Sequence, residues 1–303
     1  MDYILKTKKL KKYYGKFRAL DGLVMNVPKG SIYGFVGKNG AGKTTLIRLI
    51  CGLQFPTDGE FRLYNVKNDD RKINVVRKRM GAVVETPAIY PEMSAYDNLK
   101  MQYDILNLNK YEEIDDLLKL VNLDNVGDKL AKNFSLGMRQ RLGIAVALCG
   151  NPEFLVLDEP TNGLDPEGIV EMRNLLIKLN KERNITILIS SHILDELSKI
   201  ATHYGFIKDG KMVKEISAEE FEKECKHTIR LEVDSNNLEA VLKKEKYDYK
   251  LISDRCVELY GNVEITPLVL KLHKENINVL KLTESDESLE NYFFNLLGGD
   301  NNE

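Results

Sequence analysis

One segment of the chain fixes both a loop and the elements on either side of it. It has the pattern G-x-x-x-x-G-K-[ST] and consists of Gly37, Lys38, Asn39, Gly40, Ala41, Gly42, Lys43 and Thr44, with Thr45 directly after it. An apolar β-forming run at 31–36 precedes the segment, and apolar residues at helical spacing follow over 45–53. Glycines let successive backbone N–H groups point inward, and a helix start adds its positive end, so this context predicts a phosphate-binding loop. Lys43 is expected to reach the β- and γ-phosphates of ATP, and the Thr44 hydroxyl to ligate Mg²⁺.

Two carboxylates follow a second predicted strand, 154–157. They are Asp158 and Glu159, at the carboxyl end of a strand, where open α/β sheets bind their ligands. Asp158 is expected to hold Mg²⁺, and Glu159 to orient and partly deprotonate the attacking water. Taken alone, the pair would be a solvated acidic strand end. The phosphate-binding loop upstream favours the catalytic interpretation.

A third apolar run begins after Asn184, and His192 lies just beyond its end. A single histidine is more often a helix-capping or packed residue. At a strand end on the same side as the other two, it is expected to donate a hydrogen bond to the γ-phosphate.

The segment 133–145 contains neither a nucleophile nor a metal ligand. Ser135 is a good N-cap residue, so the segment alone predicts an ordinary capped helix. Its place between the phosphate-binding loop and the acidic strand suggests a further function.

The order of these motifs resembles that of ABC-transporter ATPases, over roughly residues 3–215. The resemblance implies that two such domains pair head to tail, with ATP between the phosphate-binding loop of one and the 135–138 segment of the other. Ser135, Gly137 and Met138 then contact the partner's nucleotide through a hydroxyl, a close backbone approach and a helix start. It also implies that Tyr14, rather than the less favoured Tyr13, stacks on adenine, and that the loop of Asp165 crosses to the partner. Thr86–Asn98 matches the surface that receives a membrane permease.

Two segments depart from the usual pattern of that family. Leu136 and Met138 stand where it usually has glycine and glutamine, and Glu85 replaces a glutamine that senses Mg²⁺. A carboxylate can ligate Mg²⁺ more strongly than an amide but donates no hydrogen bond. Both departures resemble the subgroup of bacitracin-resistance and lantibiotic-immunity exporters, although in a single sequence they could also be drift.

The expected fold is an α/β P-loop ABC ATPase domain with a mixed sheet, over 1–216, with a helical subdomain at about 86–150. A charged linker at 217–226 leads to an accessory α+β domain at 227–303. There the predicted order β-α-β-β-α-β is the ferredoxin-like arrangement. A final helix would place Leu289, Tyr292, Phe293, Leu296 and Leu297 on one face. This domain could regulate turnover, contribute to dimer packing or be a structural cap.

The composition of the chain limits the kinds of partner that we expect it to bind. The formal net charge of −2 gives no general drive towards nucleic acid, and the four cysteines lack zinc-site spacing. The start of the sequence lacks the apolar core of a signal peptide, and no window reaches about 18 uncharged apolar residues. We expect a cytoplasmic protein that reaches the inner face of the membrane through a permease.

The leading functional hypothesis is the ATP-hydrolysing subunit of an exporter of antimicrobial peptides or drugs. An alternative is an ABC ATPase without a permease, acting in translation or DNA maintenance. The single phosphate-binding loop and the lack of sustained heptads between Thr45 and Ser135 argue against those types. A third hypothesis is a nucleotide-dependent sensor, in which ATP turnover is only a switch.

Overall fold

The computed structural model of the chain describes residues 2–224, 227–235, 237–245, 247–260, 263–286 and 289–296. A mixed six-stranded sheet has the order β10-β9-β3-β8-β7-β6, in which β10 runs antiparallel to β9 and the other neighbours are parallel. The strands are β3 Ile32–Val36, β6 Met80–Val83, β7 Phe154–Asp158, β8 Thr186–Ser191, β9 His203–Lys208 and β10 Lys211–Ser217. Every residue of β3, β7 and β8 is buried. Their nearly continuous apolar sequences are typical of parallel strands covered on both faces.

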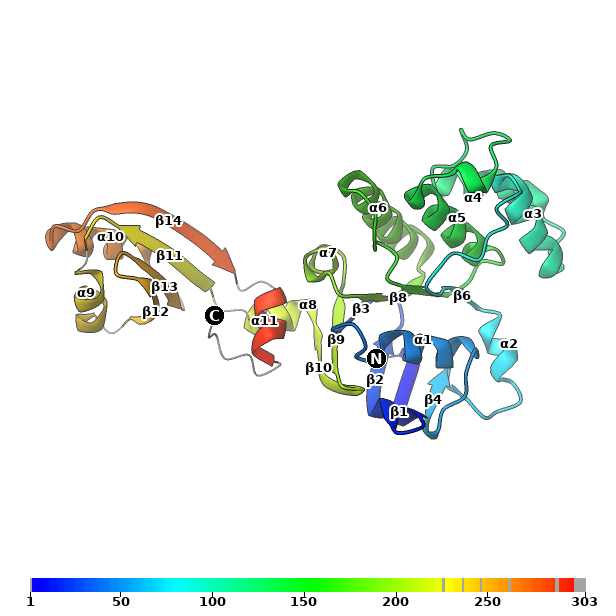
Figure 1. Cartoon of the computed structure of the whole chain (residues 1–303), viewed down its shortest axis with the longest axis horizontal. Helices are drawn as coiled ribbons and strands as arrows, with labels where there is room; N and C mark the ends of the chain where they lie inside the picture. The colour runs from blue at the N-terminus through cyan, green and yellow to red at the C-terminus, as the bar shows by residue number, and fades with distance from the viewer. Residues whose placement is uncertain are drawn as a thin grey trace. The chain divides into compact units, whose positions relative to one another are not determined.

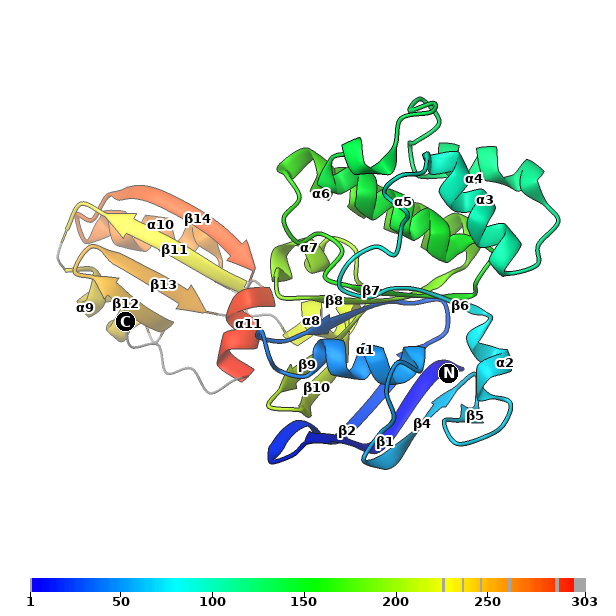
Figure 2. The ribbon, with the colours of Figure 1, turned by 45° about the vertical axis from the view of Figure 1, so that its right-hand side comes forward.

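A second, antiparallel sheet has the order β2-β1-β4-β5. Its strands are β1 Tyr3–Tyr14, β2 Phe17–Pro28, β4 Asp58–Leu63 and β5 Val66–Lys67. Helix α1, Lys43–Cys51, lies between this sheet and the six-stranded one (Figures 1 and 2). Apolar α1 residues such as Ile47 pack in one core with residues of both sheets, including Leu23 and Phe154. This packing fixes the start of α1 at the edge of the large sheet.

Helices α5, α6 and α7 cover the other face of the six-stranded sheet (Figure 2). The helices and turns around it are α2 Ile73–Arg77, α3 Ala95–Ile105, η1 Tyr111–Glu113, α4 Ile114–Leu120, η2 Ala131–Asn133, α5 Leu136–Leu148, α6 Pro166–Arg183 and α7 Leu194–Ser198. The helical part expected at 86–150 consists of α3, α4 and α5. Among the helices that the structure describes, none combines the length and apolarity needed to cross a membrane.

The chain divides into two units, Met1–Ala218 and Glu219–Glu303. The second has a four-stranded antiparallel sheet of order β12-β13-β11-β14. Its elements are β11 His227–Val233, α9 Leu238–Lys244, β12 Asp248–Ser253, β13 Cys256–Tyr260, α10 Ile265–Lys274 and β14 Val279–Asp286. Leu242 of α9 and Leu272 of α10 share a core with Leu231 and Val257 of the sheet. The chain order and strand order are those of the predicted ferredoxin-like arrangement.

The stretch predicted as a linker contains a helix, α8 Ala218–Glu224. Its Phe221 ring meets the Tyr292 ring of α11, Leu289–Leu296, edge to face at 5.0 Å, and the Tyr292 hydroxyl donates to Glu224 at 2.7 Å. A sequence rich in acidic residues and lysine is typical of a solvated connector. The local pattern does not reveal that this stretch packs against α11. Leu289, Tyr292 and Phe293 are buried, as expected for the apolar face, whereas Leu297 lies outside the described residues.

Candidate functional site

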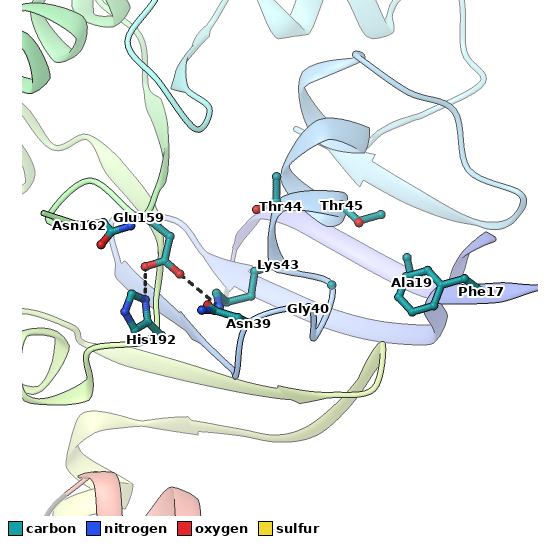
Figure 3. Close-up of a pocket in the computed structure, with 11 residues that line it drawn as sticks. Phe17, Ala19, Asn39, Gly40, Lys43, Thr44, Thr45, Glu159, Asn162 and His192 are labelled. Atoms are coloured by element: carbon teal, nitrogen blue, oxygen red, sulfur yellow. Dashed lines mark hydrogen bonds and ion pairs between the residues drawn. The ribbon is translucent and has the colours of Figure 1, made fainter. Parts of the chain in front are cut away.

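The loops that follow β3, β7 and β8 converge because the three strands are parallel neighbours and their carboxyl ends share one edge of the sheet. They border an open cavity of about 260 Å³. It is lined by Phe17, Ala19, Asn39, Gly40, Gly42, Lys43, Thr44, Thr45, Glu159, Asn162 and His192. Figure 3 shows Glu159, Asn162 and His192 at one end, Phe17 and Ala19 at the other, and Lys43 with the phosphate-binding loop between.

Close packing requires glycine at two positions of the phosphate-binding loop. Gly42 has φ +113°, and a Cβ there would lie 2.5 Å from the Ala19 carbonyl oxygen. A Cβ on Gly37 would lie 2.6 Å from Ile207 Cγ2. The loop therefore curls tightly against β2 and β9 and delivers the N-terminus of α1 to the cavity, where unpaired backbone N–H groups and the helix dipole favour an anion.

Lys43 is a buried cation, with 6% of its side chain exposed. Its ammonium donates to the Gly37 carbonyl at 2.6 Å and lies 3.2 Å from Glu159 Oε1. Burial of an unpaired charge is costly, so these partners keep the ammonium in place at the cavity wall. A phosphate entering the cavity would replace them with a stronger anionic partner.

Glu159 has a backbone conformation that L-residues rarely adopt, with φ +50°. Its Oε1 faces Lys43, and its Oε2 lies 2.7 Å from His192 Nδ1. Both carboxylate oxygens are thus held by neighbouring groups across the cavity (Figure 3). Backbone strain of this kind persists where the surrounding structure enforces it, as it does at active sites.

Asp158 is 3% exposed, and its Oδ1 accepts a hydrogen bond from the Ser190 hydroxyl at 2.6 Å. The same hydroxyl accepts from the backbone N–H of Glu159 at 3.0 Å. Ser190 lies opposite Asp158 in the register of β7 and β8. It therefore fixes both acidic residues from the neighbouring strand.

The donor set suits Mg²⁺ better than a transition metal. Over the described residues, no group of three or more His, Cys, Asp or Glu side chains could hold a metal ion by itself. Mg²⁺ commonly takes one or two protein oxygens together with phosphates and water. The Thr44 hydroxyl in the cavity wall fits that requirement. So does the carboxylate of Asp158, which lies at the end of β7 but outside the lining.

Glu85 lies outside the cavity lining, although the sequence places it among the metal ligands. Its carboxylate is held by the Arg48 guanidinium of α1, and 54% of its side chain is exposed. A nearby guanidinium neutralises the charge that would attract a metal ion.

Tyr14 likewise lies outside the lining, whereas Phe17 of the same hairpin is part of it. The Tyr14 hydroxyl donates to Gln54, and the Lys12 ammonium lies 5.2 Å from its ring centroid. These contacts draw Tyr14 towards the loop after α1. Phe17 is 60% exposed at the far end of the cavity from Glu159 (Figure 3).

The 135–138 segment begins helix α5, as its sequence predicts. Ser135 is its N-cap, and the Ser135 hydroxyl accepts from the Met138 N–H at 3.2 Å. Ser135 is exposed, and a Cβ on Gly137 would meet only Leu164, at 3.8 Å. Asp165 caps α6 by accepting from the Gly168 N–H at 3.0 Å. The cavity lining of the same chain includes none of the predicted residues Ser135, Gly137, Met138 and Asp165.

Sequence reasoning missed four residues at the site: Phe17, Ala19, Asn162 and Ser190. Asn162 follows the acidic pair by three positions, and its motif P-T-N-G-L-D-P could have drawn attention to it. Phe17 is one of several aromatic residues near position 14. Only the strand register brings Ser190 to Asp158, so no local signal identifies it.

Comparison with known proteins identifies the family of the chain. The sequence model of the ABC transporter family matches residues 20–162. The bacitracin transport ATP-binding protein BcrA of Bacillus licheniformis is 44% identical over 303 residues, 99% of each chain. The lantibiotic transport ATP-binding protein SrtF of Streptococcus pyogenes is 43% identical over 212 residues, 70% of this chain and 90% of its own.

Solved structures resemble the first unit. The cbiO1 subunit of the Clostridium perfringens ABC transporter complex cbiONQ matches with a TM-score of 0.66 and 32% identity, over 74% of this chain and 92% of its own. A dimeric ATP-binding cassette with bound ADP and Pi matches with a TM-score of 0.63 and 26% identity, over 71% and 98%. The chain therefore belongs to the ATP-binding proteins of ABC transporters, the ATP-hydrolysing subunits of that family.

Proposed function

We propose that this protein hydrolyses ATP to drive a separate membrane permease that exports antimicrobial peptides or related drugs. The observation that carries the proposal is the cavity in which Lys43, Thr44 and Glu159 meet at the start of α1. It joins an anion-binding helix start to a carboxylate suited to activating water. The names of the relatives BcrA and SrtF, which refer to bacitracin and lantibiotic transport, support the class of cargo.

ATP binding would change the partners of Glu159. Phosphate oxygens compete for the Lys43 ammonium, which now lies 3.2 Å from Glu159 Oε1. Losing that partner leaves Oε1 able to accept a proton from a water molecule in line with the γ-phosphate. His192, on the other carboxylate oxygen at 2.7 Å, would hold the side chain in orientation and donate towards the γ-phosphate.

Thr44 and Asp158 would hold Mg²⁺ next to the phosphates. Bound there, the ion supplies positive charge that offsets the charge developing on the transferred phosphoryl group. Ser190 keeps Asp158 in position through its 2.6 Å hydrogen bond. Glu85 would ligate Mg²⁺ only after its ion pair with Arg48 has opened.

Two copies would pair head to tail, so that Ser135, Gly137 and Met138 of one copy complete the site of the other. The exposed N-terminus of α5 supports this, because it offers an anion site outside its own chain's cavity. Asp165, at the start of α6, would lie near the same interface. The dimeric cassette among the similar structures is consistent with such pairing.

The permease would dock at Thr86–Asn98 and hold the protein at the inner face of the membrane. Within this segment Tyr90 is 48% and Tyr96 39% exposed. The buried Asn98 side chain accepts from the Tyr90 N–H at 2.7 Å and donates to the Ser94 carbonyl at 2.8 Å. The segment is an irregular loop that runs into the start of α3, and its internal hydrogen bonds let it present apolar side chains to a partner.

Glu159→Gln tests the ATPase mechanism. The amide cannot accept the proton of water, so hydrolysis should fall by about 10²-fold or more while ATP binding persists. Light scattering should then show a stable dimer in MgATP. Glu153→Gln is the matched control, because Glu153 is an exposed glutamate paired with Arg79 away from the cavity. Monomers of Glu159→Gln with ATP bound would contradict the head-to-tail pairing.

Purification of Glu159→Gln from gently solubilised host membranes with MgATP tests the transport function. A multi-spanning protein in near-equal amount, lost when Thr86–Asn98 is altered, would support the exporter. Ribosomal proteins or DNA-bound factors in its place would favour the alternative of an ATPase without a permease.

A further inference from the structure

The backbone at Glu85 is strained. Its φ is +61°, and across it the Thr86 N–H donates to the Val84 carbonyl at 2.8 Å. A three-residue turn with positive φ at its centre is rare and costly for a residue with a side chain. The turn follows β6 directly, at the same sheet edge as Asp158. Strain at this position suggests that the direction of the Glu85 side chain matters.

The partner of Glu85 lies one helical turn from the candidate metal ligand. Arg48 and Thr44 are four residues apart in α1, so they share a face and lie about 6 Å apart along it. The Arg48 guanidinium forms an ion pair with the Glu85 carboxylate. The side chains are 36% and 54% exposed, so the pair is accessible to solvent and can open without disrupting a core.

We propose that Arg48, one helical turn from Thr44, is a positioning residue that holds the Glu85 carboxylate and competes with Mg²⁺ for it. This inference rests on the proposed binding of Mg-nucleotide at Thr44. When the ion is bound, the carboxylate moves from the guanidinium towards it, and when the ion leaves, Arg48 takes the carboxylate back. The surface segment Thr86–Asn98 begins at the next residue, so this exchange couples metal occupancy to that segment.

The competition predicts a specific non-additivity. In Arg48→Gln, Glu85 no longer has to leave a partner before meeting the ion. The Mg²⁺ concentration that half-saturates binding of a fluorescent ATP analogue should therefore fall by about 2- to 5-fold, the size of an exposed ion pair. In the Glu85→Gln background, Arg48→Gln should produce a smaller shift, because only the general effect of a lost positive charge remains. Arg48→Lys keeps a cation and should stay near wild type.

Hydrogen exchange gives a readout that does not depend on turnover. Without nucleotide, Arg48→Gln should raise exchange of the amides in 84–98, and Mg-nucleotide should reduce the difference from wild type. Arg79→Gln is the matched control, since it removes an arginine from an exposed pair with Glu153. It should change neither the Mg²⁺ dependence nor exchange in 84–98.

Two results would overturn the inference. One is a Mg²⁺ shift from Arg48→Gln that is equally large in the wild-type background and in the Glu85→Gln background, which would make Arg48 only a background charge. The other is unchanged exchange of 84–98 in Arg48→Gln. Failure of the proposed function would look different, because wild-type protein would then not bind the nucleotide analogue with Mg²⁺ at all.

Discussion

The Glu159 carboxylate lies where a catalytic base is needed, yet its two oxygens are held by neighbouring side chains. Lys43 and His192 occupy its two carboxylate oxygens, at 3.2 and 2.7 Å. A base held in this way is poorly available to water until an anion draws Lys43 away. The structure thus suggests why the site would hydrolyse little until a nucleotide is fully bound.

Phe17 is predicted to contact the base of the nucleotide, because it lines the end of the cavity opposite Glu159. Phe17→Ala should weaken ATP binding by about 5- to 100-fold, the range expected for loss of one base–aromatic stack. Calorimetric titration would measure it, with inorganic tripolyphosphate as the probe without a base. Binding of tripolyphosphate should not change. A larger loss for ATP in Tyr14→Ala would instead support the role that the sequence assigns to Tyr14.

Two cysteines should be unreactive at neutral pH. Burial raises the pKa of Cys51 to about 12, with Arg77 opposing the shift and Asp158 adding to it, and burial raises the pKa of Cys149 to about 12. The thiolate is the reactive form, so at pH 8 alkylation should be on the order of 10³-fold slower than in the unfolded chain, and it should accelerate as pH rises. Peptide mapping after iodoacetamide treatment, with and without urea, measures this. Equal rates in the two states would disprove the burial argument.

At the scale of elements, the same N-cap chemistry serves two purposes. Ser135 caps α5 and Ser94 caps α3, each by accepting a backbone N–H three residues on, at 3.2 and 3.1 Å. Ser94 is buried, whereas Ser135 is exposed. The cap of α3 is therefore structural, and that of α5 is also accessible to a second chain.

Ser135→Ala and Ser94→Ala should separate these purposes. Each loses a cap worth about 1 kcal/mol, so both should lower the melting temperature by a similar few degrees. Only Ser135→Ala should also reduce ATP hydrolysis by the purified protein, because its hydroxyl would face the partner's nucleotide. Melting curves and phosphate-release assays on the same samples provide the comparison. Equal hydrolysis by the two variants would argue against a role for Ser135 in the site.

At the scale of the whole molecule, the cavity of one chain is only half of the proposed site. The phosphate-binding loop and the 135–138 segment belong to one unit, yet the latter is not part of its cavity lining. A two-fold head-to-tail dimer supplies both halves twice. Activity should therefore depend on which chains meet.

Mixing two inactive variants tests this dependence. Lys43→Ala damages the cavity, and Ser135→Arg blocks the helix start that would face the partner. Each should be inactive alone. A 1:1 mixture should recover about a quarter of wild-type hydrolysis, because half of the dimers are mixed and each of these has one intact composite site. No recovery, with mixed dimers demonstrated by two affinity tags, would mean that both groups serve the same chain's nucleotide.

Local sequence determined much of this protein. The glycines and Lys43 require a phosphate-binding loop between a strand and a helix, and the run from 154 to Glu159 requires a buried strand ending in acids. Alternation and helical spacing beyond 227 determined the ferredoxin-like order, because each such element carries its own periodicity. These features depend on neighbours a few residues away, which is why they are readable without a structure.

Tertiary structure decided the relations between distant residues. The register of β7 with β8 brings Ser190 to Asp158, and the hairpin turn at 14–17 sends Phe17 rather than Tyr14 to the cavity. The approach of β6 to α1 lets Glu85 pair with Arg48, which lies 37 residues away in the chain. The predicted linker contains helix α8, which packs against α11. Each of these depends on which surfaces meet when the sheets and helices pack, and no periodicity within a segment encodes that.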